Sequence, residues 1–275
     1  MSLRLRVVAP RQGLFWLRAS FGQFVRRPLS YMGLFVMYLL AVLFALSIPV
    51  LGSLLVVTSL PLLTLTYLHA TRAAVSGGSV LVSAFVEPLR AASRRDRIAF
   101  LKLSLAYGAL TLVIVALSDV IDAGSFAKVQ SAMIGGDDLA LSDDERTNLL
   151  AGMALRFGLA ALVSIPFWHA PALILWHGQG VGLALFSSAL ACWKARGALA
   201  VYAAAWFAVV AGVGISMALL LGVLGLRSFV GAMALPGGLI LTAVFYVSLY
   251  FIYADSFEVG DEAAAATAIE PPTAT

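Results

Sequence analysis

Residues 28–71 read PLSYMGLFVMYLLAVLFALSIPVLGSLLVVTSLPLLTLTYLHAT and contain no aspartate, glutamate, lysine or arginine. About 20 apolar residues in a helix cross the hydrocarbon core of a bilayer, so this stretch is long enough to cross it twice. Pro49 and Gly52 favour a turn at its middle. Because the backbone must satisfy its own hydrogen bonds inside lipid, we predict two membrane-spanning helices, at about 30–48 and 51–70.

The rest of the chain continues this pattern. Three further runs lack all four charged residue types: residues 157–193, 197–226 and 228–254. Together with the apolar segment after residue 97, they predict four more spans, at about 98–119, 150–176, 198–226 and 235–254. The predicted fold class is therefore all-α: an integral membrane bundle of about six transmembrane helices over residues 30–254, with short amphipathic helices at the membrane interface.

The composition argues against a soluble domain. Of the 275 residues, 61% are hydrophobic and 12% are charged, whereas a soluble domain carries about 25% charged residues. The net charge of +4 does not indicate a nucleic-acid partner, because the basic residues lie beside the apolar spans rather than in one patch. The single cysteine, Cys192, cannot form an internal disulfide.

The basic residues predict the orientation of the chain. Most of them lie before span one, between spans two and three, and between spans four and five, which six spans place on one side. The opposite side carries Lys128, Arg146 and Arg227 beside an acidic run at 137–145. Since lysine and arginine are enriched on the cytoplasmic side of membrane proteins, we expect both termini to be cytoplasmic.

Both ends of the chain are predicted to lie outside the bilayer. Residues 1–29 form a basic cytoplasmic segment, and residues 11–27 within it have the pattern of an interfacial helix, a simple tail being the alternative. Its apolar residues recur at three- and four-residue spacing: Leu14, Leu17, Phe21 and Phe24. Residues 255–275 cannot bury enough apolar surface to fold and are expected to form a disordered cytoplasmic tail.

Arg156 interrupts an otherwise apolar span. An ionisable side chain at membrane depth is costly and indicates a functional site by default. Arg156 could face a ligand, reach the outer headgroups, or pair with Asp119 or Asp122 at the end of span three.

His169 lies between two prolines in the same span. Prolines five residues apart can kink or unwind a helix, and broken helices line substrate sites in transporters. An aromatic belt at the inner interface is the alternative, with Trp168 and His169 at headgroup level. The residues of this candidate intramembrane polar site are Arg156, His169, Pro166 and Pro171.

No other pattern in the sequence indicates chemistry. There is no nucleophile–base pair, no paired carboxylates and no phosphate-binding glycine loop. His169 and His177 stand about 12 Å apart along a helix, too far to share a metal ion. We therefore expect no catalytic residue, no cofactor and no metal. Span five carries small residues four apart, which suit close packing against another span or another copy: Ala204, Ala208, Gly212 and Ser216.

Several motifs at the span ends carry a family resemblance. They are Gly13-Leu-Phe-Trp16-Leu-Arg18, Arg27-Pro28-Leu29, Phe167-Trp168-His169-Ala170-Pro171, Trp176-His177-Gly178 and Ala191-Cys192-Trp193-Lys194. Together they resemble a family of uncharacterised polytopic inner-membrane proteins of proteobacteria, over roughly residues 10–255. More loosely, the layout resembles the membrane domain fused to some glycerophosphodiester phosphodiesterases, although no enzymatic domain accompanies it here. The resemblance implies the fold and a place in the bacterial inner membrane, and it supplies no catalytic residues.

Two functions remain open at this point. The first is a non-enzymatic membrane protein of the cell envelope that acts through membrane lipid, or through a second copy at span five. The alternative is a transporter or permease for a small molecule, a lipid or an anion, which would use the kinked fourth span. The sequence names no substrate for either.

Overall fold

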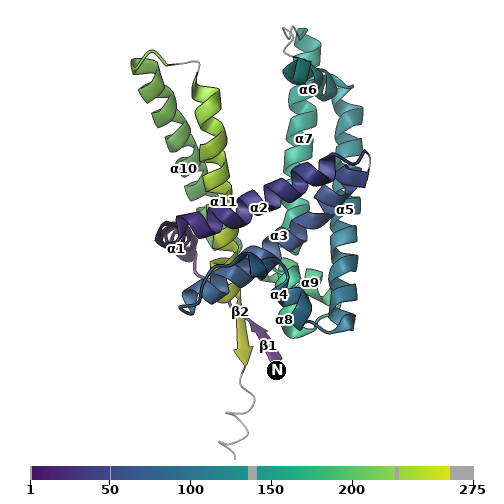
Figure 1. Cartoon of the computed structure of the whole chain (residues 1–275), viewed down its shortest axis with the longest axis vertical. Coiled ribbons are helices and arrows are strands. Elements are labelled where there is room, and N and C mark those ends of the chain that lie inside the picture. Colours follow the sequence, from purple (N-terminus) through teal and green to yellow (C-terminus); the bar gives the residue numbers. More distant parts are fainter. Residues whose placement is uncertain (1, 50, 136–140, 227–228, 261–275) are drawn as a thin grey trace, which may run out of the picture.

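The computed structural model describes residues 2–49, 51–135, 141–226 and 229–260 (Figure 1). Their helices are α1 (Gln12–Arg26), α2 (Pro28–Leu46), α3 (Leu51–Val75), η1 (Val82–Phe85), α4 (Glu87–Ala91), α5 (Arg94–Asp122), α6 (Ser125–Gly135), α7 (Asp143–Phe167), α8 (Ala170–His177), α9 (Val181–Lys194), α10 (Arg196–Val223) and α11 (Val230–Ser256). Two short strands complete the described elements: β1 (Ser2–Leu5) and β2 (Phe257–Gly260).

Six helical segments are long and apolar enough to cross a membrane, which confirms the predicted fold class. They are α2, α3, α5, α7 continued by α8, α10 and most of α11. Several helices extend beyond the predicted spans, because a helix can continue into the headgroup region. The largest extension is at α7, which begins at Asp143 because the Ser142 hydroxyl accepts a hydrogen bond from the backbone N–H of Glu145.

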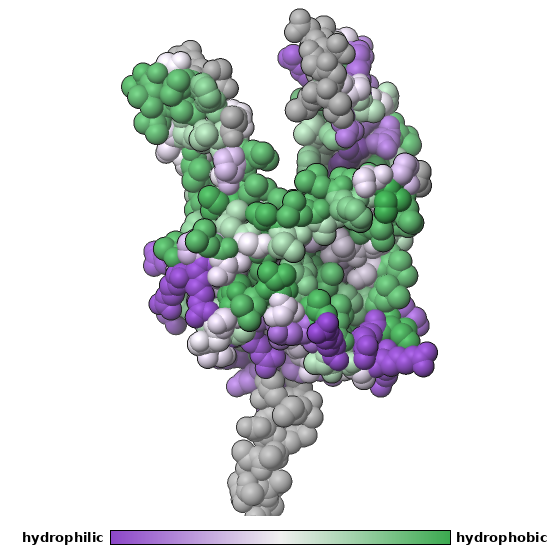
Figure 2. Space-filling model, viewed as in Figure 1, coloured by the Kyte–Doolittle hydropathy of each residue, from purple (hydrophilic) through white to green (hydrophobic). Residues whose placement is uncertain are grey.

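The spans are arranged as two arms that join at one end (Figure 1). In the α5–α7 arm, α5 and α7 pack along each other, and α6 packs against both at the outer end. The α10–α11 arm is formed by the last two spans. The α2–α3 hairpin runs obliquely across both arms, and α3 packs against α5 and α11. Figure 2 shows a hollow between the outer parts of the two arms, with mainly apolar visible walls.

The arms join at a base formed by α1, α8, α9 and the inner ends of α3, α5, α10 and α11. One cluster of buried side chains draws on most of these helices, including the fully buried Trp16, Leu68, Leu103, Leu173 and Ile252. Burying large apolar side chains contributes roughly 1.5–3 kcal/mol each relative to water exposure, although lipid reduces this difference in the spans. The base therefore contains the larger of the two clusters of buried apolar side chains among the described residues.

Helix α1 packs into this base with one face. A Cβ atom at Gly13 would strike the carbonyl oxygen of Ala198, so glycine permits a close crossing of α1 and α10. The indole N–H of Trp16 donates to Asp255 Oδ2 at 2.7 Å, which ties α1 to α11. Leu14, which the sequence placed on the apolar stripe, is 42% exposed, because the buried face is centred on Trp16 instead.

The two ends of the described chain lie side by side. Strand β1 pairs antiparallel with β2, with Leu5 opposite Phe257. Both ends of the described chain therefore lie on one side of the spans, at the end of the molecule where α5 begins (Figure 1). Residues 257–260, assigned from sequence to a disordered tail, form this strand, while residues 261–275 of the predicted tail lie outside the described residues.

Candidate functional site

Arg156 reaches from α7 to the outer end of α5. Its Nη2 atom lies 2.5 Å from Oδ1 of Asp119 and 3.5 Å from Oδ2 of Asp122. Its Nε atom donates to Ser118 Oγ at 2.7 Å, and its guanidinium lies 4.2 Å from the centre of the Phe126 ring. The Asp122 side chain is 2% exposed, so Arg156 supplies the positive charge that a buried carboxylate requires.

A glycine on α7 makes this ion pair possible. A Cβ atom at Gly152 would lie 2.5 Å from Cβ of Asp122, so a larger residue would push the two helices apart. The guanidinium also faces the negative end of the α5 dipole, where a cation is favourable. Arg156 is therefore a structural tie within the α5–α7 arm, which is one of the alternatives that the sequence left open.

Span four breaks between α7 and α8. Pro166 lies in the last turn of α7, and Pro171 lies in the first turn of α8, where its missing N–H costs no helical hydrogen bond. Ser188 of α9 bridges the break: its Oγ accepts from the backbone N–H of His169 at 3.3 Å and donates to the Ile165 carbonyl at 3.4 Å. The prolines thus interrupt the helix, and one hydroxyl of α9 binds a backbone N–H and a carbonyl at the break.

Cys192 lies one helical turn after Ser188 on α9. Its Sγ atom is 4.0 Å from the Ile165 carbonyl oxygen, and the side chain is buried. Burial raises the pKa of the Cys192 thiol to about 12, because a thiolate would lose its hydration there. The thiol therefore stays protonated and unreactive at neutral pH.

His169 is fully buried at the break, with its ring against Tyr253 and Phe257 at centroid distances of 5.9 and 5.6 Å. Neither ring nitrogen has a hydrogen-bond partner among the described residues. Arg156 lies thirteen residues earlier, about 20 Å away along a helix. The structure therefore brings His169 and the two prolines together at the break but leaves Arg156 near the middle of α7.

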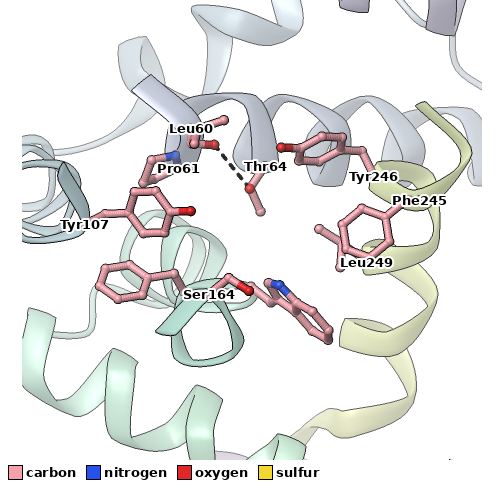
Figure 3. A pocket seen from close by; sticks show the side chains of 10 residues that line it. Leu60, Pro61, Thr64, Tyr107, Ser164, Phe245, Tyr246 and Leu249 are labelled. Carbon is pink, nitrogen blue, oxygen red and sulfur yellow. Dashed lines mark hydrogen bonds between the residues drawn. The ribbon is translucent and has the colours of Figure 1, made fainter. Parts of the chain in front are cut away.

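A cavity of about 110 Å³ lies where both arms meet α3 (Figure 3). Its lining combines apolar side chains with hydroxyl groups: Leu60, Pro61, Thr64, Tyr107, Ser164, Phe167, Trp168, Phe245, Tyr246 and Leu249. The α5–α7 arm, the α10–α11 arm and the break in span four all contribute to this lining. Hydroxyl groups from four spans, α3, α5, α7 and α11, converge on this cavity.

The hydroxyl groups of the cavity fall into two kinds. Those of Thr64 and Ser164 donate to carbonyls of their own helices, at 3.2 and 2.8 Å, and keep their lone pairs as acceptors. Those of Tyr107 and Tyr246 point toward the cavity from opposite sides (Figure 3). The lining can therefore donate to, and accept from, a polar group that enters with an apolar chain.

A comparison with known proteins gives the chain a relative of nearly equal length. A probable inner membrane protein of Burkholderia thailandensis is 29% identical to it over 262 residues, which cover 95% of this chain and 97% of that protein. The chain is a distant homologue of this protein. With its six candidate spans, it is a multi-pass protein of the inner membrane. No family model matches the chain, and no solved structure matches it at a significant level.

The small residues of α10 lie on the surface of this inner membrane protein. All four members of the ladder are exposed: Ala204, Ala208, Gly212 and Ser216. A Cβ atom built at Gly212 meets no atom within 4 Å. Among the described residues, the ladder therefore packs against no other span, and its face is open to lipid or to another molecule.

Sequence reasoning did not find the cavity or the role of Ser188. Tyr107 and Tyr246 are ordinary half-buried residues of their helices, and they meet only because α5 and α11 both pack on α3. Ser188 is a small polar residue on an amphipathic helix, with no pattern to mark it. The prolines of span four were the one available signal, because a broken helix needs a partner for its freed backbone groups.

Proposed function

We propose that this inner membrane protein is a non-enzymatic, lipid-interacting protein that holds an amphipathic lipid between its two arms. The observation that carries the proposal is the hydroxyl-lined cavity at the point where the arms meet. The apolar part of the lipid would lie in the hollow between the arms, and an ester or hydroxyl group would meet the tyrosines. A cavity of about 110 Å³ admits a polar group or a chain end, not a whole drug-sized ligand.

The surroundings of the hollow support a lipid occupant. The visible walls of the arms are mainly apolar (Figure 2), and water against apolar walls is unfavourable. The two arms leave the hollow open along their outer parts, so acyl chains of the bilayer have access to it. Membrane helices that do not pack on each other are covered by acyl chains, which are as apolar as leucine.

The cavity lining supports a role without catalysis. It contains no carboxylate, thiol or imidazole, the groups that most often transfer protons or act as nucleophiles. Arg156, the strongest functional candidate from the sequence, is occupied by Asp119 and Asp122. The remaining groups are suited to binding.

Transport is the second candidate, and the break in span four favours it. Phe167 and Trp168 line the cavity beside the break, so a change at the break would reshape the cavity. A permease would need an aqueous or polar path through this region. A lipid-filled cavity and a water-filled one are therefore the two outcomes to separate.

The proposal also includes the orientation of the chain in the membrane and a contact between two copies of it. The arginines near the start of α5 lie at the same end as the paired strands, so both termini are cytoplasmic in this account. A second copy of the chain would pack through the exposed ladder of α10, where small residues let helices approach closely.

Photo-crosslinking tests the lipid occupant. Purified protein is mixed with a phospholipid that carries a photoreactive acyl chain, and labelled peptides are mapped after irradiation. Ser164→Phe fills the cavity and should abolish labelling of the α3 and α11 lining residues. Leu162→Phe places the same ring on a side chain that is 65% exposed, and labelling should persist. Equal labelling in both variants, or none in the parent protein, would count against the proposal.

A further inference from the structure

We infer that the groove between the first turns of α5 and α9 binds the phosphate headgroup of an anionic phospholipid. The groove holds about 650 Å³ and lies away from the cavity of Figure 3. Its basic residues are Arg94, Arg95 and Lys102, and its apolar residues include Ile98 and Val181. The inference rests on the membrane location of the chain and on the proposed cytoplasmic orientation, and not on the occupant of the cavity.

The cations of this groove lack the acidic partners that other cations of the chain have. Among the described residues, no carboxylate oxygen lies within 4.0 Å of a side-chain nitrogen of Arg94, Arg95 or Lys102. Arg156, by contrast, contacts two carboxylates. The side chains of all three groove cations are exposed. Their charge is therefore available to an external anion.

The helical spacing of α5 collects these groups on one face. Ser93 caps the helix by accepting from the N–H of Asp96, which makes Arg94 and Arg95 the first helical residues. Residues three, four and seven positions apart share a helix face, so Arg95, Ile98 and Lys102 are neighbours. Lys102 begins about 10 Å deeper than Arg95, and its long side chain can extend back toward the headgroups.

The backbone adds positive charge from two directions. The N-terminus of α5 carries a partial positive charge, and its first turns hold three cations, Arg94, Arg95 and Arg97, against the carboxylate of Asp96. Helix α9 begins beside the groove at Val181, after Gly180, and no side chain caps its first N–H groups. An anion in the groove would offset both effects.

An apolar track leads from the groove into the bilayer. Ile98, Leu101 and Leu105 follow one another along α5, and they are 45%, 57% and 52% exposed. Their spacing of three and four residues aligns them on one strip. A free phosphate would use the cations alone, whereas a phospholipid would use the cations and this strip, so the combination favours the phospholipid.

The position relative to the membrane agrees with this occupant. The cytoplasmic leaflet is rich in anionic lipid, and basic pockets between helices on that side bind phosphate headgroups. The groove lies at the end of the spans where the strands β1 and β2 pair and where α5 begins (Figure 1). Charge, shape and depth therefore all match an anionic phospholipid.

The test counts lipids bound to the intact, purified chain. Native mass spectrometry in mixed micelles would compare phosphatidylglycerol with phosphatidylcholine for the parent and for Arg95→Gln/Lys102→Gln. We expect the parent to prefer phosphatidylglycerol and the variant to bind it roughly 25-fold more weakly, at about fivefold per lost charge. A matched control, Arg90→Gln/Lys194→Gln, removes two exposed charges outside the groove and should retain the preference.

Three results would overturn the inference. An equal loss of phosphatidylglycerol binding in the control variant would show that the lipid is attracted to any basic residue of the surface. Displacement of the lipid by an equal concentration of inorganic phosphate would show a soluble-anion site. No preference for phosphatidylglycerol in a parent protein that unfolds normally would remove the site altogether. Because the variants leave the cavity untouched, photo-crosslinking at Ser164 and its neighbours still reports separately on the proposed function.

Discussion

The two helices of each arm are held together by different contacts. The α5–α7 arm carries an internal polar tie, in which Arg156 contacts Asp119 and Asp122, and Gly152 permits close contact. The α10–α11 arm has a hydrogen bond between Tyr202 and Ser248 near the base, and no ion pair joins its described residues. Most side chains of the outer part of α10 are exposed.

This difference indicates how much each arm depends on surrounding lipid for its stability. Both arms expose apolar side chains to the bilayer, but the helices of the α5–α7 arm are also joined by ion pairs, whereas the outer part of the α10–α11 arm has none among its described residues. The comparison therefore predicts large mutational effects in the first arm and small ones in the second.

Arg156→Ala should have the largest effect. Removing one partner of a buried ion pair typically costs about 3–5 kcal/mol, because the other charge is left uncompensated. We expect a marked fall in the thermal unfolding temperature in detergent, and partial recovery when Asp122→Asn is added. Arg146→Ala, an exposed position on the same helix, should change stability by no more than about 0.5 kcal/mol. Equal stability of the Arg156→Ala and Arg146→Ala variants would show that the ion pairs of Arg156 do not stabilise the arm.

A pair of glycine substitutions compares the arms directly. Gly152→Ala places a methyl group against Asp122 and should destabilise the protein by about 1–3 kcal/mol. Gly212→Ala on α10 meets open space and should be neutral or stabilising by up to about 1 kcal/mol, because alanine favours helix. Thermal unfolding of the two variants side by side measures the difference. Similar losses would mean that both arms are equally packed.

A smaller effect is expected at the exposed partner of Arg156. The Asp119 side chain is 57% exposed, so Asp119→Asn should cost at most about 1 kcal/mol. High salt should reduce even this difference, since exposed charges are screened. A loss as large as that of Arg156→Ala would instead assign the tie to Asp119 and leave Asp122 without a role.

The six predicted spans agree with the helices of the structure because a single property of the sequence, the absence of charge, determines them. Charge-free length alone locates the six helices, because hydrocarbon excludes charge whatever the tertiary contacts are. The break in span four followed from Pro166 and Pro171 in the same way. The site did not follow, since Tyr107, Ser164 and Tyr246 converge only through the packing of four helices.

The smallest signal is expected from thiol labelling in the base beneath the arms. Cys192 is buried and its thiol has a pKa near 12, so maleimide should label it very slowly at pH 7.5 in the folded protein. Ser76→Cys in a Cys192→Ala background lies in an exposed turn and should label within minutes. Labelling of Cys192 should appear only on unfolding. Rapid labelling in the folded state would mean that the base opens.

The most direct test of the account asks what fills the cavity at the junction of the arms. Ser164→Cys and Leu162→Cys are each introduced into a Cys192→Ala background, and the two proteins are reconstituted into liposomes. The rate at which each cysteine reacts with a small water-soluble methanethiosulfonate is then measured, so that access is read before the cavity is filled. The account predicts slow reaction at Ser164→Cys, as at Leu162→Cys on the lipid-facing side. Fast reaction at Ser164→Cys alone would contradict it and would favour an aqueous path.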